Sequence, residues 1–411
     1  MTTRADLAAL DQSDPLARKR EEFFVPEGLI YLDGNSLGAL PKAVIGHLEH
    51  VVKEQWGRDL ITSWNKHGWI DLAERVGAKI ARLIGAEPDE VVAADSTSVN
   101  LFKVLLAALK LRPERPVIVS DIDNFPTDLY IAQGVNQLLG GRYELRLVKK
   151  DQLEAALDEH TAVLMLTEVD YRSGWRYDMA ALTRLAQQKG ALVIWDLAHS
   201  AGAFPVRLNA CNADFAVGCG YKYLCGGPGA PAFLYVARRH QSAVLPFLSG
   251  WMGHRAPFAF DPFYDPAEGV QRMKVGTPPV LSLSALDKAL EVFADVDMEE
   301  LRRKSLRLGD VFIERMEPLC RRYGFELVTP LEPERRGSQV AYAHPEGYAI
   351  MQALIAEGVI GDFRAPNILR FGFTPLYLRY QEVAEAVERL ERVMSRELWK
   401  AERFRERAKV T

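Results

Sequence analysis

The strongest constraint on the fold is a set of short, continuous apolar runs separated by helix-forming segments. The run TAVLMLTEV covers residues 161–169 and the run ALVIW covers residues 191–195, with a helical pattern from Asp178 to Lys189 between them. A continuous apolar run of this length is typical of a strand buried on both faces, and strands that alternate with helices form parallel sheets. The sequence therefore predicts an α/β fold built on a mostly parallel, doubly wound sheet.

The chemistry is concentrated in residues 191–236. The predicted strand ALVIW delivers Asp196 at its carboxyl end, the next turn carries His199, and a Gly-rich loop presents Tyr221 and Lys222. Ligands of open α/β sheets bind beyond the carboxyl ends of the strands, so we expect Asp196 and Lys222 to face one crevice. This pair suits pyridoxal phosphate, for which a lysine forms the Schiff base and an acid keeps the pyridine nitrogen protonated. For either residue alone, a capping acid or a solvated lysine is the simpler interpretation.

Charge and composition exclude several classes of partner. The chain has 411 residues, of which 51 are basic and 55 acidic, for a formal net charge of −4. This balance gives no electrostatic case for nucleic acid or for a membrane surface. Residues 1–23 carry charge throughout and hold no apolar stretch of signal or membrane-spanning length, so a cytoplasmic protein is expected. The four cysteines show no metal-ligand spacing, and no metal site is predicted.

The pattern changes after the Gly-rich loop, which predicts a second domain. The segments FELVTP, SQVAYAH and ILRFGF are strand candidates interleaved with helical stretches, as in a smaller α+β domain. We therefore predict a large α/β domain over residues 26–290 and a small C-terminal domain over residues 291–411. The helical segment 1–25 is expected to pack on the small domain.

Two further turns have a composition that suits a phosphate and a planar ring. In VVAADSTSVNLFKVLLAAL, Thr97 and Ser98 lie where a helix begins, and a helix N-terminus favours a phosphate. A plain helix cap explains the same residues. In DNFPTD, Phe125 precedes another helix, where it can stack on a ring or serve as a hydrophobic staple.

Taken together, these motifs resemble the kynureninase family, whose members are pyridoxal-phosphate enzymes with the fold type I aminotransferase architecture. The resemblance extends over most of the chain and rests on YLDGNSLGALPK, STSVN, FPTD, WDLAHSAG, GYKYLCGGPGAPAF, GWMGH, GTPPVLSLSAL and LRFGFTPLY. The acid and the lysine alone would indicate only the superfamily. The tyrosine beside the lysine in YKYL, with GWMGH and LRFGFTPLY, narrows the resemblance to the family.

The resemblance implies roles for the residues that would surround the cofactor. Lys222 would be the Schiff-base lysine and Asp196 the partner of the pyridine nitrogen, with Phe125 stacked on the ring. The other implied cofactor contacts are Thr97, Ser98, Asp128, Thr167, His199, Tyr221, Trp251 and Thr277. Trp251 and Thr277 are expected to come from the neighbouring subunit of a homodimer.

The resemblance also implies residues that would bind the substrate. Arg370 in LRFGFTPLY matches the family's α-carboxylate arginine, and a guanidinium can bind a carboxylate through two parallel hydrogen bonds. Asn35 in YLDGNSLG and Trp64 in the aromatic loop 62–69 are the further candidates, although Trp64 could equally be packing under the loop. An indole at this position, with Thr277, predicts a preference for kynurenine over 3-hydroxykynurenine.

The implied activity is hydrolysis of the Cβ–Cγ bond of L-kynurenine to anthranilate and L-alanine, in tryptophan catabolism. Tyr221 is the candidate for proton exchange during cleavage, and no metal is needed. One alternative is another enzyme of the same fold, such as a cysteine desulfurase or an aminotransferase. A second alternative is a non-catalytic, cofactor-binding regulatory protein, which would be expected to carry an added nucleic-acid module.

Overall fold

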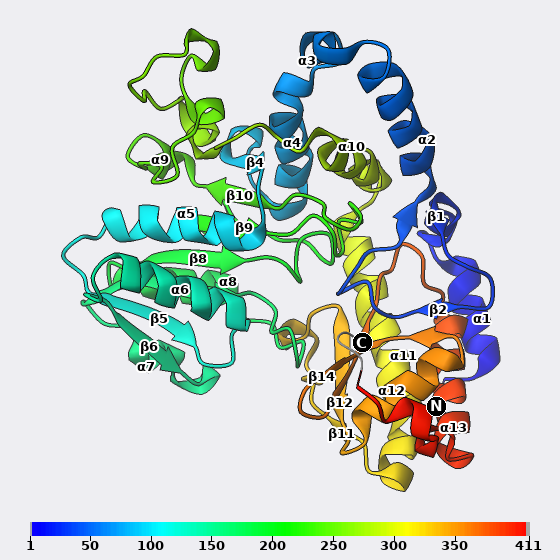
Figure 1. Ribbon diagram of the computed structural model, residues 1–411. Coiled ribbons are helices and arrows are strands. Elements are labelled where there is room, and N and C mark those ends of the chain that lie inside the picture. Colours follow the sequence, from blue (N-terminus) through cyan, green and yellow to red (C-terminus); the bar gives the residue numbers. More distant parts are fainter. Residues whose placement is uncertain (1, 408–411) are drawn as a thin grey trace. The chain divides into compact units, whose positions relative to one another are not determined.

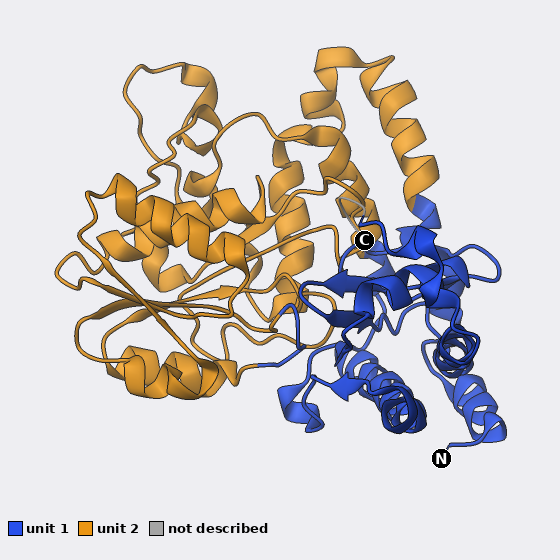
Figure 2. Ribbon diagram, turned by 60° about the horizontal axis from the view of Figure 1, so that its bottom comes forward, with its two compact units in different colours: residues 1–43, 171–176, 291–411 blue, residues 44–170, 177–290 orange. Residues whose placement is uncertain are grey.

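The structure is a computed structural model that describes residues 2–407, and its chain forms two compact units. Unit 1 combines residues up to 43 with residues 171–176 and those from 291 onward, and unit 2 combines residues 44–170 and 177–290 (Figure 2). No helix in the described part of the chain is long and apolar enough to cross a bilayer.

Unit 2 is built on a seven-stranded sheet. In chain order its strands are β4 (Val91–Ala93), β5 (Val117–Asp121), β6 (Glu144–Val148), β7 (Thr161–Thr167), β8 (Leu192–Asp196), β9 (Phe215–Gly218) and β10 (Phe233–Val236). The spatial order is β4-β10-β9-β8-β7-β5-β6, and only β10 runs antiparallel to its neighbours. Every residue of all strands except β6 is buried, as the continuous apolar runs require. The predicted α/β fold with a mostly parallel sheet is confirmed.

Helices lie alongside this sheet (Figure 1). Those of unit 2 are α2 (Lys42–His50), which starts at the unit boundary, α3 (Ser63–Lys66), α4 (Leu72–Ile84), α5 (Thr97–Lys110), α6 (Pro126–Leu138), α7 (Leu153–Ala156), α8 (Met179–Gln188), α9 (Arg238–Gln241) and α10 (Val280–Ala289). In α4 the stripe Ala73, Val76, Ile80 and Leu83 is buried, and Gly85 ends the helix with φ of +64°.

Unit 1 pairs a small sheet with four helices. The helices are α1 (Arg4–Ser13), α11 (Met298–Tyr323), α12 (Gly347–Ala356) and α13 (Tyr380–Ser395). The sheet has the order β11 (Glu326–Leu327), β12 (Gln339–Ala343), β15 (Ile368–Gly372), β14 (Asp362–Arg364), with all pairs antiparallel. Two short pairs complete the unit: β1 (Phe23–Phe24) with β3 (Leu40–Pro41), and β2 (Ile30–Tyr31) with β13 (Val359–Ile360).

The N-terminal part of the chain belongs to unit 1 through backbone pairing. The strand β2 pairs in parallel with β13, and Asp33 forms an isolated bridge with Gly372. The carboxylate of Asp11 in α1 accepts hydrogen bonds from the first N–H groups of α13. The units thus group residues 26–43 with the C-terminal part, whereas the sequence was interpreted as placing them in the large domain. The domain limits 26–290 and 291–411 stay a prediction.

Candidate active site

The structure brings Asp196, His199 and Lys222 together at the carboxyl ends of β8 and β9. Asp196 is the last residue of β8, is buried, and accepts a 2.7 Å hydrogen bond at Oδ1 from the backbone N–H of Ala198. Lys222 lies in the loop after β9, and its Nζ is 3.0 Å from Nε2 of His199. Burial raises the pKa of Asp196 above its ordinary value, and the nearby charge of Lys222 opposes this rise. The charges of Asp196 and Lys222 therefore attract each other.

A second buried acid, Asp128, lies beside Asp196. Asp128 stands in the first turn of α6, and burial, followed by the charge of Asp196, raises the pKa of Asp128 well above its usual range. Two adjacent buried carboxyls cannot both ionise, so one of them keeps a proton. The negative charge is favoured on Asp196, because the backbone N–H of Ala198 donates to it and the charge of Lys222 opposes the rise of its pKa.

Asn124 organises the adjoining turn, and it was missed in the sequence. Its Oδ1 accepts a 2.6 Å hydrogen bond from Oγ1 of Thr167 and a 2.8 Å hydrogen bond from the N–H of Phe125. Its Nδ2 donates to Oγ of Ser120 at 3.2 Å. The Thr167 hydroxyl also lies 3.3 Å from Oδ2 of Asp128. Asn124 thus links β5, β7 and α6. The available signal was its place directly before Phe125 in the DNFPTD motif.

The helix that begins at Thr97 is confirmed. Ser96 is the N-cap of α5, with its Oγ accepting from the N–H of Val99 at 3.3 Å, so Thr97 and Ser98 occupy the first two helical positions. The N–H groups of a first helical turn have no partner within the helix. Ser96 accepts from Val99, so the N–H groups of Thr97 and Ser98 are the candidates to bind an anion, and the phosphate contact stays a prediction. Phe125 is the N-cap of α6 and is 41% exposed, and stacking of its ring on the cofactor stays a prediction.

Tyr221 lies next to Lys222 in the loop after β9. Burial, and next the neighbouring Cys219, raise the pKa of the Tyr221 phenol above its ordinary value, which favours the protonated form. The Nζ of Lys222 is 5.9 Å from the centre of the tyrosine ring. A protonated phenol is a candidate proton donor.

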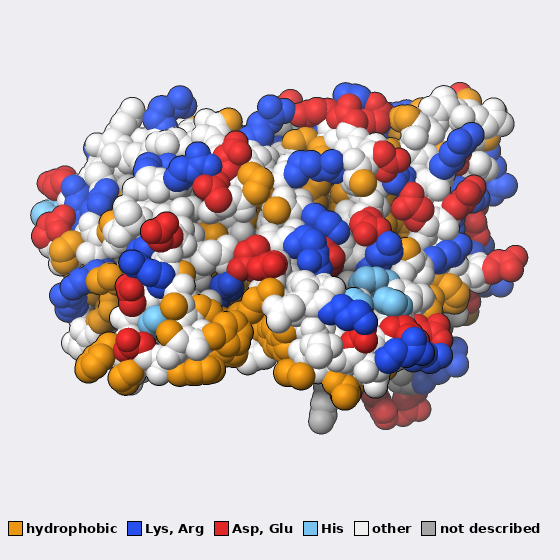
Figure 3. All heavy atoms as spheres, turned by 90° about the horizontal axis from the view of Figure 1, so that it is seen from above, with side chains coloured by type: hydrophobic (Ala, Val, Ile, Leu, Met, Phe, Trp, Pro, Cys, Tyr) orange, Lys and Arg blue, Asp and Glu red, His pale blue; other side chains and the backbone are white. Residues whose placement is uncertain are grey.

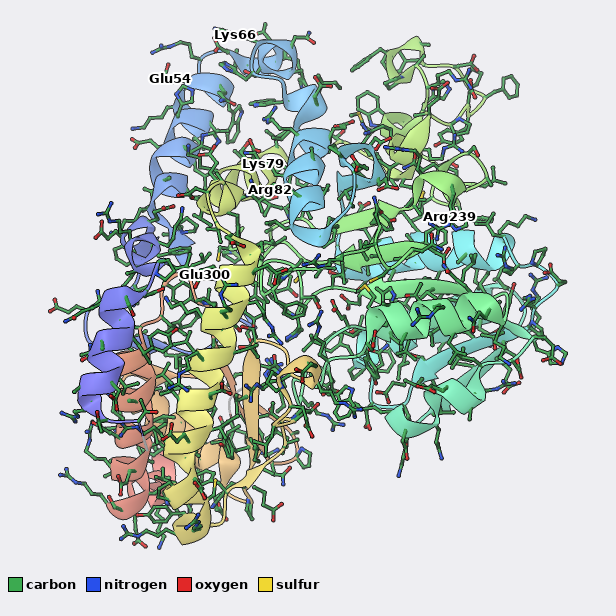
Figure 4. All side chains as sticks on the ribbon, turned by 180° about the vertical axis from the view of Figure 1, so that it is seen from behind. Glu54, Lys66, Lys79, Arg82, Arg239 and Glu300 are labelled. Atoms are coloured by element: carbon green, nitrogen blue, oxygen red, sulfur yellow. The ribbon has the colours of Figure 1, made fainter. Side chains whose placement is uncertain are left out.

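Three other predicted residues of unit 2 stand on more exposed segments. Trp251 is 37% exposed and packs edge-to-face on Phe258 at 5.5 Å between ring centres. Thr277 lies three residues before the start of α10. It is exposed and lines a cavity of about 80 Å³. Trp64 is half-buried and packs edge-to-face on Trp69 at 6.2 Å. Figure 4 shows Lys66, the last residue of α3 and two residues after Trp64. Among residues 2–407 no hydrogen bond or ring contact joins these three to Lys222.

Arg370 lies in unit 1 on β15, directly opposite Asp362 of β14. It is 1% exposed, and its Nε donates to Oδ1 of Asp362 at 2.8 Å while Nη2 bonds the other oxygen. The sequence led us to expect that this two-bond edge would be open for a substrate carboxylate, but Asp362 occupies it. Nothing in the sequence pointed to Asp362, because only the strand register places it opposite Arg370.

Asn35 is fully buried within unit 1. Its Nδ2 lies 3.4 Å from Oε1 of Gln339, and its side chain packs against Gly372 so closely that a Cβ there would collide with it. Gly372 is therefore needed for the close approach. Substrate contact by Asn35 stays a prediction. Within the described residues, no group of three or more His, Cys, Asp or Glu could hold a metal ion.

Comparison with known protein families gives two matches. A family described as the kynureninase C-terminal domain matches residues 301–390. A family described as DegT/DnrJ/EryC1/StrS aminotransferases matches residues 58–207.

Full-length relatives and solved structures agree with these matches. The chain is 53% identical over 416 aligned residues to the kynureninases of Pseudomonas fluorescens and Burkholderia mallei, with 100% of both chains covered. Its fold is similar to that of the cysteine desulfurase CsdA from Escherichia coli, with a TM-score of 0.76, 21% identity, and coverage of 92% of this chain and 98% of the other. It is also similar to a mutant of C-DES with glycine covalently linked to its PLP cofactor, with a TM-score of 0.78, 16% identity, and coverage of 90% and 98%. The two structures establish the fold alone.

Proposed function

The chain belongs to the kynureninase family, and on that premise we propose that it hydrolyses the Cβ–Cγ bond of L-kynurenine to anthranilate and L-alanine, with pyridoxal phosphate as cofactor. The pathway it serves would be tryptophan catabolism. The observation that carries the proposal is the placement of Lys222 and the buried Asp196 at the carboxyl ends of β8 and β9, together with 53% identity over the full length to proteins of that name.

The residues of unit 2 fit the proposed cofactor group by group. When bound, the cofactor supplies an aldehyde for the amine and a cationic ring that accepts the electrons released at the substrate α-carbon. Lys222 offers the amine, and Asp196 offers a buried carboxylate for the ring nitrogen. Phe125 offers an exposed aromatic face, and the first turn of α5 offers N–H groups for the phosphate. Asp128 and Thr167 support Asp196 and the adjoining turn.

Two residues are proposed to move protons during the reaction. Lys222, once released, can take the proton from the substrate α-carbon. His199, at 3.0 Å, holds the amine in place. Water would add to the Cγ carbonyl carbon and supply an oxygen of the anthranilate carboxylate, and Tyr221 would deliver its proton to Cβ as the Cβ–Cγ bond breaks. A phenol can do this without a metal.

Four residues are proposed to bind the substrate. Arg370 would bind the α-carboxylate, and Asn35 would support that end of the substrate. Trp64 and Thr277 would lie against the aromatic ring, where neither offers a strong partner for a 3-hydroxyl group.

A homodimer is proposed as the working unit, because unit 2 exposes large apolar side chains. Figure 3 shows hydrophobic side chains gathered on the face seen from above. The exposed aromatic residues near Trp251 are Phe247, Phe258, Phe260 and Phe263, which are 47%, 59%, 76% and 81% exposed. Exposed large apolar side chains in one segment of the chain support an interaction site there. Trp251 and Thr277 would then complete the partner's site. An active monomer in analytical ultracentrifugation at assay concentration would contradict this.

The direct test is to incubate the purified holoenzyme with L-kynurenine and follow anthranilate by fluorescence. Anthranilate and alanine in equal amounts are expected. Parallel assays with L-cysteine, and with amino acids plus a 2-oxo acid, test the desulfurase and aminotransferase alternatives. Activity in one of these assays without anthranilate formation would overturn the proposal, and no turnover in any assay would favour a regulatory cofactor-binding protein.

A further inference from the structure

Arg370 lies in a cluster of four charged side chains within unit 1. Asp362 of β14 pairs with Arg370 across the strands, and Arg364, two residues further on β14, also binds the Asp362 carboxylate at 2.8 Å. Asp33 forms a bridge with Gly372, which lies two residues after Arg370 on β15. Residues two apart on a strand point to the same face. Asp33, opposite Gly372, therefore lies on the same face as Arg370 and belongs to the cluster.

The hydrogen bonds of Arg370 leave little of its guanidinium free. A guanidinium has five N–H groups. Nε and one N–H of Nη2 bind Asp362, and the second N–H of Nη2 donates to Oγ of Ser36 at 3.0 Å. One N–H of Nη1 donates to the carbonyl of Tyr171. Among the described residues the other N–H of Nη1 has no acceptor. A substrate carboxylate can therefore accept a hydrogen bond from only this N–H of Arg370. The affinity for the carboxylate then depends strongly on the net charge of the side chains around Arg370.

Asp33 is the acid of the cluster that is not satisfied. Its Oδ1 is buried and, within residues 2–407, has no hydrogen-bond partner. Burial, and then the charge of Asp362, raise the pKa of Asp33 to about 7. The polar groups that face it from its own turn, β14 and β15 are Ser36, Asp362, Arg364 and Arg370, and Gly34 packs under Thr374 and the Tyr377 hydroxyl.

The charge of the cluster depends on the protonation of Asp33. Against the raising effect of burial, Arg370 holds the pKa of Asp362 below its ordinary value, so Asp362 is ionised. With Asp33 neutral, two arginines face one carboxylate and the cluster carries one positive charge. With Asp33 ionised, the cluster is neutral. An incoming carboxylate is attracted only in the first state.

We propose that Asp33 sets the charge of the place where Arg370 binds the substrate α-carboxylate: the neutral acid admits the carboxylate, and the ionised acid repels it. This rests on the proposed function, in which Arg370 binds that carboxylate. Asp33 then determines how well the site binds a ligand with a carboxylate, and it does so through the net charge of the cluster. Substrate binding is strong below the pH at which Asp33 ionises and weakens above it.

The test is the pH dependence of KM for L-kynurenine in the wild-type holoenzyme, in Asp33→Asn and in the matched control Glu391→Gln. Glu391 is an exposed carboxylate on α13. We expect wild-type KM to rise about tenfold between about pH 6 and about pH 8.5, which corresponds to one unit of pKa coupling. Asp33→Asn should keep KM within about twofold over that range. Glu391→Gln should follow the wild type.

A substrate analogue without the carboxyl group separates the effect of Asp33 on carboxylate binding from the titration of other groups in the enzyme. The amine that remains when the α-carboxyl group is removed from kynurenine should inhibit wild type and Asp33→Asn with the same pH dependence. A flat wild-type KM, or an equal rise of KM in Asp33→Asn, would overturn the proposal. If Asp33→Asn does not fold, the wild-type profiles for kynurenine and the amine decide by themselves, because only the kynurenine profile should show the rise. Absence of anthranilate at every pH would instead refute the proposed function.

Discussion

Asp362 binds Arg370 along the edge of its guanidinium, with 2.8 Å between Nε and Oδ1, on adjacent strands of a small sheet. The side chains are 3% and 2% exposed. Two charges buried this deeply stabilise each other only as a pair, since removal of one leaves the other uncompensated. This pair gives Arg370 one fixed orientation.

Replacing Asp362 by Ala should lower the free energy of unfolding by about 3–5 kcal/mol, because it leaves Arg370 buried without its counter-ion. Urea unfolding followed by circular dichroism measures the loss. Glu385→Ala, which removes the exposed partner of Arg389, is the matched control and should cost below about 1 kcal/mol. Equal losses in the two variants would contradict the prediction.

Replacing Asn124 by Ala should reduce kcat/KM by about tenfold or more, because the Thr167 hydroxyl and the N–H of Phe125 lose their shared acceptor. The dissociation constant of the cofactor, measured by equilibrium dialysis, should rise with it. Gln133→Ala removes an amide from the exposed side of α6 and should behave like the wild type. An Asn124→Ala enzyme with unchanged cofactor affinity and activity would show that the turn does not need this residue.

Asp33 should make the stability of the cofactor-free protein depend on pH in a defined direction. Its pKa is about 7 in the folded chain, against 3.8 as the ordinary value, so the folded state binds the extra proton between these limits. The cost of ionising the buried Asp33 lowers the free energy of unfolding. This cost is absent at low pH, grows as pH rises from about 4 to about 7 and is complete above about pH 7. Relative to the wild type, Asp33→Asn should therefore gain up to a few kcal/mol at about pH 8 and nothing at about pH 4. Thermal unfolding at both pH values gives the comparison, and equal shifts at both would contradict it.

Replacing Lys222 by Ala should remove the covalently reducible cofactor and lower kcat by at least about a thousandfold. Asp196→Ala should retain some cofactor but lose most turnover, since no carboxylate then holds the ring nitrogen protonated. Lys110→Ala, at the exposed end of α5, is the control. Borohydride reduction and dialysis, followed by absorption, identify the lysine. Reducible cofactor in Lys222→Ala would assign the bond to another lysine.

The ratio of kcat/KM for kynurenine over 3-hydroxykynurenine should be about 10 to 100, because a 3-hydroxyl near Trp64 and Thr277 would be left without partners. Introducing Trp64→His and Thr277→Asn together should move the ratio toward the hydroxylated substrate. Both kinetic parameters need measuring on both enzymes. A wild-type ratio near one, or a double variant with an unchanged ratio, would remove these residues from the ring site.

The order and type of the elements could be predicted from the sequence because their signals are local. Continuous apolar runs such as 161–169 can be buried only inside a sheet covered on both faces, and strands of that kind formed its centre. The helix starting at Thr97 was visible for the same reason, since cap residues and periodicity lie within a few positions of one another. The spacing of Asp196 and Lys222 placed both at the carboxyl ends of neighbouring strands.

The tertiary structure alone decided which polar groups meet and what charge they carry. Thr167 reaches Asn124 across 43 positions of sequence, and Asp362 reaches Arg370 only because the register of β14 and β15 sets them opposite each other. The raised pKa values of Asp128 and Asp33 come from burial and from neighbouring carboxylates. Register, burial and through-space charge depend on the distances between remote segments, which no local sequence pattern encodes.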